Sequence, residues 1–437
     1  MKSKLWATVI LSFLLSIISL SPVIAASNRD PLNGQNLFRD VERYVRLGDH
    51  RTATVGDYRT AGWLKNSLRR AGYDTRTQRW STRQFYPLKT RVIIDHKTHL
   101  QGFPVWWPKP TDFRGITGQL SQDIENTDGK IYLFVNLSEA TFTVTEQFQE
   151  TIETAWNNGA VGVIVVTYYA GTDSIASDEF IGLNAEQDIQ KQWPVPVVSV
   201  MARDFEHLQD ALDHQSKVTL ISAGIYNDHA TGLNVIATLD RGPGSNKVVV
   251  TTPYSGWFTC AGERGSGIAI FLGLARWAAE NTKNTTWVFT ATSGHELKAL
   301  GIEDYLQKGT APAPDDILCW VHLGAWQAMY NYVVQDGVLV PTKDLDLRYM
   351  QYRGYPAMAS AVGQNFSSPD LNITLIPTVL FGDLLEVENF GYQNLWGITY
   401  GHEFHHSTQD LPVVTGPEIL EPTARAYQGA LLDIIGE

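Results

Sequence analysis

The chain has 437 residues, of which 43% are hydrophobic and 18% are charged. This composition is typical of a globular protein, and the length predicts two or three domains or one large domain with an insert. The formal net charge is −12 at pH 7. The sequence contains no basic stripe and no cluster of lysine and arginine, so it gives no reason to expect nucleic-acid binding.

The first 26 residues have the pattern of an export signal. Lys2 and Lys4 precede an uncharged apolar run over residues 5–20, and small residues follow up to Ala26. The run is short for a transmembrane helix, which needs about 20 residues. No later apolar stretch is long enough to span a bilayer. We therefore expect residues 1–26 to be a cleaved signal peptide, and the mature protein to be periplasmic or extracellular, with no membrane partner.

The mature chain begins with a helix–loop–helix pattern between Leu37 and Tyr73. Its middle differs, because short β-like runs dominate from about residue 85 to 225. An amphipathic stretch lies between two of these runs, at 148–158. The expected strands of this middle region are 91–94, 130–135, 161–166 and 195–200.

The last third of the chain alternates strands and helices. We expect strands at 234–239, 247–252, 286–292 and 317–323, and helices at 267–280, 296–307 and 422–435. This alternation predicts an α/β fold with a mostly parallel, helix-covered sheet. In open sheets of this kind, ligands bind beyond the carboxyl ends of the strands.

Three segments at such strand ends carry side chains suited to metal chemistry. They are Thr251–Ser255 with Ala261–Gly267, then Ser293–Glu296, then His405–Asp410. Their order and spacing resemble metallopeptidase family 28, the zinc aminopeptidases that also include glutaminyl cyclases and the non-enzymatic transferrin receptor. The resemblance implies the zinc aminopeptidase fold for the last third of the chain.

The middle of the chain resembles a protease-associated domain through segments 129–131, 159–165 and 195–198. The two resemblances imply a β-rich protease-associated domain at 86–227, inserted into a catalytic fold formed by 27–85 and 228–437. Such an insert would shape access to the pocket rather than take part in the chemistry.

The resemblance implies that one of the family's two metal sites is lost. The histidine of the His-x-Asp motif falls on Pro253, the aspartate of that motif on Ser255, and a later strand-end aspartate on Gly324. Proline and glycine have no side chain that can bind zinc. His322 lies on the same side of its strand as Gly324 and is a candidate substitute. A packed or hydrogen-bonded histidine is the favoured interpretation of His322.

The other metal site keeps its ligands in the same comparison. The bridging aspartate falls on Glu263, the metal glutamate on Glu296 and the final metal histidine on His406. Two carboxylates and an imidazole leave one position for water, as in catalytic zinc sites. The family's general base, a glutamate, falls on His295, whose side-chain type suits proton transfer near neutral pH. The alternative is a polar pocket without metal.

Further polar side chains are candidates for the same pocket: Cys260, Arg264, His402 and His405. Two rival motifs exist. Residues 402–406 satisfy H-E-x-x-H, but this motif requires a helix and its flanks predict a loop. Cys260 with His295 or His406 would suit a thiol hydrolase, which is a weak signal. We expect Cys260 and Cys319 to be free thiols, because parallel strands would place them at opposite edges of the sheet.

The sequence therefore predicts an exported, aminopeptidase-like hydrolase with one zinc ion, acting on an amide-type small molecule or a peptide. The catalytic candidates are His295, Glu263, Arg264, Cys260 and His405, and the metal candidates are Glu263, Glu296 and His406. Two alternatives stay open. One is a binding or scaffold protein that has lost its activity, and the other is a metal-free enzyme with a remodelled pocket.

Overall fold

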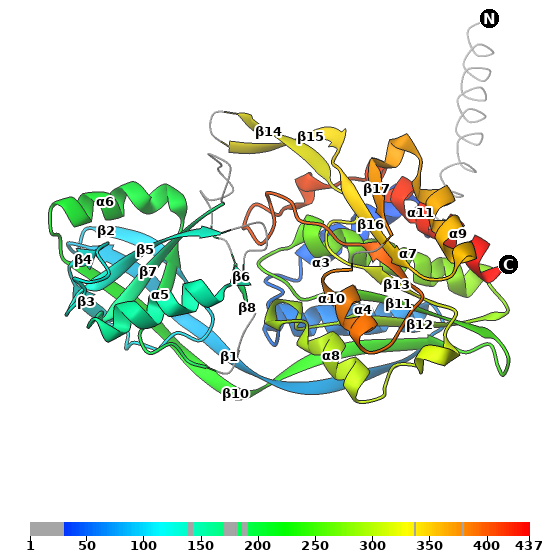
Figure 1. The fold of residues 1–437 in the computed structure, drawn as a ribbon, viewed down its shortest axis with the longest axis horizontal. Helices are drawn as coiled ribbons and strands as arrows, with labels where there is room; N and C mark the ends of the chain where they lie inside the picture. Colours follow the sequence, from blue (N-terminus) through cyan, green and yellow to red (C-terminus); the bar gives the residue numbers. More distant parts are fainter. Residues whose placement is uncertain are drawn as a thin grey trace, which may run out of the picture.

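The computed structural model describes residues 30–138, 143–169, 180, 182–185, 191–335, 338–377 and 380–437. The predicted signal peptide lies outside them. In this part of the chain no helix is both long and apolar enough to cross a membrane. The molecule has two lobes joined by two long antiparallel strands, β1 (Asp74–Ile94) and β10 (Val218–Leu239) (Figure 1).

The larger lobe contains the predicted parallel sheet. At its centre four parallel strands lie in the order β18 (Leu395–Ile398), β13 (Cys319–Leu323), β11 (Asn246–Pro253) and β12 (Thr285–Thr292). Antiparallel neighbours flank this centre on both sides. They are β10 and β1 beside β12, and β16 (Arg348–Arg353), followed by β17 (Ile373–Ile376), beside β18. The predicted α/β fold is confirmed.

Helices cover both faces of this sheet because its central strands are apolar on both sides. Val248 and Val250 belong to one core cluster and Val249 to another, as the two-residue period of a strand requires. The first cluster is covered by α3 (Gly34–Val45), α4 (Val55–Arg70), α7 (Ser266–Asn281), α9 (Pro356–Phe366) and α11 (Pro417–Ile435). The second is covered by α8 (Leu300–Gln307) and α10 (Asp383–Asn389).

The smaller lobe is β-rich and is formed between β1 and β10. Its strands follow the order β2 (Thr98–Pro104), β9 (Val197–Val200), β7 (Gly162–Tyr169), β5 (Ile131–Ser138) and β4 (Leu120–Ser121). Its helices are α5 (Glu146–Asn157) and α6 (Phe205–Asp213), and its short strands are β3 (Ile116–Gly118), β6 (Thr143–Val144) and β8 (Asn184–Ala185). The predicted boundaries at residues 85 and 227 fall inside β1 and β10, and register shifts bracket residue 85.

Two expected helices begin at other residues than predicted. The helix expected from Glu296 begins at Leu300, because Lys298 and Ala299 have φ of 57° and 58°, which a right-handed helix cannot include. The C-terminal helix begins at Pro417 and contains Pro422. The sequence patterns also missed a hairpin, β14 (Tyr330–Gln335) with β15 (Val338–Leu345).

Candidate active site

Glu263 lies on a π-helical turn, Ala261–Gly265, that leads into α7. The Asp410 carboxylate fixes this turn, since it accepts hydrogen bonds from the backbone N–H groups of Gly262 (2.6 Å) and Glu263 (3.0 Å). Glu263 is completely buried. Such π-helical turns are frequent at functional sites, and this one directs a carboxylate into the interior at the carboxyl ends of the parallel strands.

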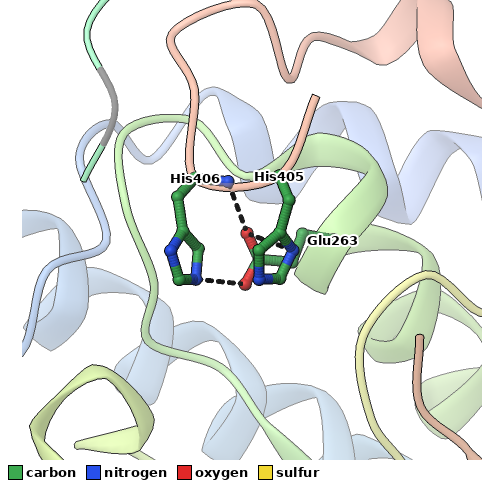
Figure 2. Close-up of side chains that lie close together, drawn as sticks. All are labelled: Glu263, His405 and His406. Atoms are coloured by element: carbon green, nitrogen blue, oxygen red, sulfur yellow. Dashed lines mark hydrogen bonds and ion pairs between the residues drawn. The ribbon is translucent and has the colours of Figure 1, made fainter. Parts of the chain in front are cut away.

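Glu263, His405 and His406 bring potential ligand atoms within 4.8 Å of one another, and all three residues are buried or nearly so (Figure 2). The His406 Nε2 atom lies 3.4 Å from Glu263 Oε1, and the His405 Nδ1 atom lies 3.7 Å from Glu263 Oε2. The two imidazole rings stack with their centroids 3.9 Å apart. This group combines one carboxylate with two imidazoles.

Backbone and indole groups orient the two imidazoles. The Nδ1 of His406 donates to the carbonyl oxygen of Gly182 at 3.1 Å, which directs Nε2 toward Glu263. A metal-binding histidine typically donates its second nitrogen in this way. His405 differs, because the indole N–H of Trp326 donates to its Nδ1 at 2.8 Å. If His405 binds a metal ion through Nδ1, this hydrogen bond must break.

Arg264 supplies a buried positive charge beside Glu263. The Nη2 of Arg264 lies 2.9 Å from Glu263 Oε1, and its Nε donates to the carbonyl of Ser255. Burial works to raise the pKa of Glu263, but His405, Arg264 and His406 outweigh it and hold that pKa well below its usual range. Burial lowers the pKa of His405 well below its ordinary value. At neutral pH the site therefore contains a buried carboxylate–guanidinium ion pair.

Cys260 lies in the same cluster, where its thiol donates to Glu263 Oε2 at 3.5 Å. Burial, followed by the charges of Glu263 and Asp410, raises the pKa of Cys260 well above its ordinary value. Because the thiolate is the nucleophile, the structure does not favour the thiol hydrolase. Burial and Glu263 also raise the pKa of Asp410 to about 8. Both cysteines are buried and free, as predicted.

His295 occupies a short turn before α8 and pairs with Asp383. Its Nδ1 lies 2.7 Å from Asp383 Oδ1, and Asp383 is the first residue of α10. The imidazole side chain keeps 19% exposure while the carboxylate is buried. Burial opposes ionisation of Asp383, but His295 outweighs it and the pKa of Asp383 falls to about 2. An ionised aspartate behind a histidine fixes the orientation of the ring, as in catalytic triads. The sequence analysis did not identify Asp383.

Glu296, predicted as a metal ligand, lies apart from the Glu263 group. Its Oε1 accepts hydrogen bonds from the backbone N–H and the hydroxyl of Thr52, both at 2.6 Å, and its Oε2 accepts one from the Ser255 hydroxyl at 2.7 Å. Ser255 also accepts from the backbone N–H of Gly294. Glu296 therefore links the loop before α4 to the turn that carries His295. In the described residues, His405 rather than Glu296 joins Glu263 and His406.

The side of the pocket that carries Pro253 and Gly324 has no room for a larger residue at position 324. A Cβ added to Gly324 would lie 2.0 Å from the hydroxyl of Thr399. The nearby His322 is buried, its Nδ1 lies 3.0 Å from the hydroxyl of Thr251, and burial lowers its pKa to about 4. His322 belongs to no metal-ligand group among the described residues, which agrees with the hydrogen-bonded interpretation.

The H-E-x-x-H segment is a loop, as predicted, and so does not form a zinc-binding helix. Its first histidine, His402, stacks near Trp326 with ring centroids 4.8 Å apart and is not part of the Glu263 group. His406 at the other end has φ of 56°, an uncommon backbone conformation that turns its side chain toward Glu263.

The smaller lobe reaches this loop through residues 180 and 182–185. The backbone N–H of Gly182 donates to the carbonyl of His406 at 2.8 Å, and Thr408 donates to Phe180. The indole of Trp257 donates to Asn184, and a Cβ on Gly182 would lie 2.1 Å from the Trp257 ring. Close packing between the lobes thus adjoins the Glu263 group.

Comparison with known proteins identifies the fold. No protein-family model and no curated protein sequence matches the chain. Among solved structures it is similar to BSAP, a zinc aminopeptidase from Bacillus subtilis, with a TM-score of 0.70 and 15% identity over 92% of this chain and 95% of that chain. It is also similar to a peptidase M28 precursor from Shewanella amazonensis, with a TM-score of 0.67 and 15% identity over 94% and 96%.

An aminopeptidase from Aneurinibacillus sp. strain AM-1 gives a TM-score of 0.60 at 15% identity, with 93% and 94% of the two chains covered. Each of these similarities extends over both lobes, since it covers more than nine-tenths of the chain. The chain therefore has the fold of the M28 zinc aminopeptidases, as the sequence resemblance predicted.

Proposed function

We propose that this protein is an exported, aminopeptidase-like hydrolase that cleaves an amide bond in a peptide or small molecule, with one zinc ion bound in an altered site. The observation that carries the proposal is the buried group of Glu263, His405 and His406. Its composition, one carboxylate and two imidazoles, is that of a catalytic zinc site with one open position. Export rests on the signal-peptide pattern of residues 1–26.

The residues present fit a transition-metal ion in donor type and closeness. Glu263 is held ionised, and His406 presents Nε2 to it while Nδ1 donates to Gly182. In this proposal His405 takes the role that the sequence had suggested for Glu296. A zinc ion bound there would supply Lewis-acid chemistry toward a carbonyl group.

His295 is the proposed proton-transfer residue. Because Asp383 holds Nδ1, the remaining nitrogen, Nε2, is the atom that would accept a proton from an attacking water and return it to the leaving amine. Asp383 is a positioning residue in this scheme, since it acts through His295. Its substitution by Asn is expected to lower kcat with little change in KM and to alter the pH profile. Substitution by Glu, which keeps the charge, should restore part of the activity.

A metal-free pocket is the second candidate, and two contacts favour it. The guanidinium of Arg264 already balances the charge of Glu263 at 2.9 Å, and the indole of Trp326 already occupies Nδ1 of His405. In this alternative Arg264 stabilises negative charge in the transition state, and the His295–Asp383 pair transfers protons without a metal ion.

Metal analysis of the purified full-length protein, combined with cleavage of chromogenic aminoacyl amides, tests the proposal. We expect close to one equivalent of zinc, with loss of both zinc and activity in His406→Ala. The exposed His229 gives a matched control, since it belongs to no metal-ligand group among the described residues. Zinc-free protein that retains activity after chelation would instead support the metal-free pocket. Absence of both zinc and activity would support a binding or scaffold protein.

A further inference from the structure

A second cavity, separate from the candidate active site, lies between α3 and α4. Its volume is about 710 Å³, and four arginines, Arg43, Arg46, Arg59 and Arg70, are among its eight lining residues, with no acidic residue among them. Gly62 and Trp63 also line it. We call this cavity the arginine groove. It is distinct because its lining shares no residue with the cluster around Glu263.

The groove results from helical spacing rather than from a basic run in the sequence. Arg59, Trp63 and Arg70 are four and seven residues apart on α4, so they lie on one face of that helix. Arg43 lies in the last turn of α3 and Arg46 caps that helix. Both helices pack against α7. The sequence has no basic run here, so these arginines come together only in the fold.

The positive charges of the groove are only partly compensated, since Arg70 interacts with the Asp40 carboxylate, which also pairs with Arg276. In the described residues, the side chains of Arg43 and Arg59 have no ion pair and no hydrogen bond. Arg46 faces Glu42 at 3.8 Å, but both side chains are well exposed, and such pairs contribute little. Arg70 donates to the hydroxyl of Ser67. Four like charges in one cavity repel one another, and this cost is offset when an anion binds.

The groove has the chemistry of an oxyanion site. A guanidinium presents planar pairs of N–H donors that match the oxygens of phosphate or carboxylate groups. Trp63 is partly buried and supplies an aromatic wall. The volume lies within the range of small-molecule sites, about 300–1,000 Å³. We propose that the arginine groove binds a small, multiply charged oxyanion of the phosphate or carboxylate class.

Calorimetric titration of the full chain with pyrophosphate and with citrate tests this proposal and separates the two classes of anion. The buffers must have matched ionic strength, because exposed charges are screened by salt. We expect Arg59→Gln and Arg43→Gln each to weaken binding by about tenfold or more, as for the loss of a charge-assisted hydrogen bond. Arg69→Gln is the matched control, since Arg69 is an exposed arginine on α4 outside the lining.

A second variant tests the groove without changing its charge. A Cβ added to the helical Gly62 meets no atom within 4 Å, so Gly62→Leu can occupy the groove without strain. We expect this variant to fold normally and to lose binding of the preferred probe. The proposal fails if neither probe binds below about 1 mM. It also fails if Arg69→Gln weakens binding as much as Arg59→Gln, or if Gly62→Leu binds as tightly as the parent chain.

Discussion

The two sides of the candidate active site are built in opposite ways. On one side Pro253 and Gly324 replace ligands expected from the resemblance, and the hydroxyl of Thr399 fills the space beside Gly324. On the other side Glu263 remains buried and ionised among Arg264, His405 and His406. Burying a charge destabilises the fold unless the charge is paired. Filling the space beside Gly324 with the side chain of Thr399 has no such cost. The first side is packed like the core, whereas the second holds a buried carboxylate among imidazoles and a guanidinium, the group on which the proposed function rests.

The largest loss of stability among the tests of this comparison is expected from Glu263→Gln. It leaves the buried Arg264 without its counter-charge, which costs about 3–5 kcal/mol for a broken buried pair. Chemical denaturation of this variant, with Glu280→Gln at the exposed end of α7 as control, measures the loss. If Glu263→Gln unfolded with the same free energy as wild type, the ion pair would not stabilise the protein, and the contrast with the first side would fail.

The first side is tested by Gly324→Ala. The added methyl group would lie 2.0 Å from the Thr399 hydroxyl, so we expect a loss of about 1–3 kcal/mol, as for overpacking of a core. Thermal unfolding measures this loss. The double variant Gly324→Ala with Thr399→Ala should recover part of it. If Gly324→Asp with Pro253→His instead added a second equivalent of metal, the space would still be open and the comparison would be wrong.

On the side of the site that contains Glu263, the stability of the protein is expected to depend on pH through Asp383. Its folded-state pKa of about 2 lies below the ordinary value of 3.8, so the ionised form stabilises the fold above pH 3.8. This contribution, about 2 kcal/mol, is lost as the pH falls from 3.8 through 2. Unfolding of wild type and Asp383→Asn at pH 6 and pH 2.5 should give a stability gap that narrows at the lower pH. A gap independent of pH would contradict the shift.

The smallest expected effect is that of Trp326→Phe. It removes the indole donor to His405 and should cost about 1 kcal/mol, the net value of one hydrogen bond. The same change leaves Nδ1 of His405 without that donor. Competition with a chromophoric chelator should therefore show tighter zinc binding in Trp326→Phe if His405 is a ligand through Nδ1. Unchanged zinc affinity would show that Nδ1 of His405 is not a ligand.

The sequence predicted local features of the site better than contacts between distant segments. Glu263 and His406 were predicted through the family resemblance of short motifs at strand ends, and the parallel sheet brings such ends together. Asp383 lies 88 residues from His295, and its segment matched no motif, so their 2.7 Å contact had no local signal. The contact of Glu296 with Thr52 also had no local signal, since Thr52 belongs to a loop 244 residues away.

The fold shows the same limit. The strands and helices of the central α/β unit were predicted from their periodicity, whereas the arginine groove requires knowing how α3 and α4 lie beside each other. The turn after His295 was predicted as helix because its composition suits one. Lys298 and Ala299 interrupt it, because both have a left-handed backbone conformation. Neither residue is a glycine, so nothing in the sequence indicated this conformation.

The carbonyl of Gly182 that orients His406 lies 224 residues before it in the sequence. During synthesis the smaller lobe can fold long before its imidazole partner exists. The two ends of this contact can meet only after residue 406 has been made. A chain that stops before residue 406 therefore lacks the Glu263 group, and a protein without the smaller lobe would lose the Gly182 carbonyl that orients His406.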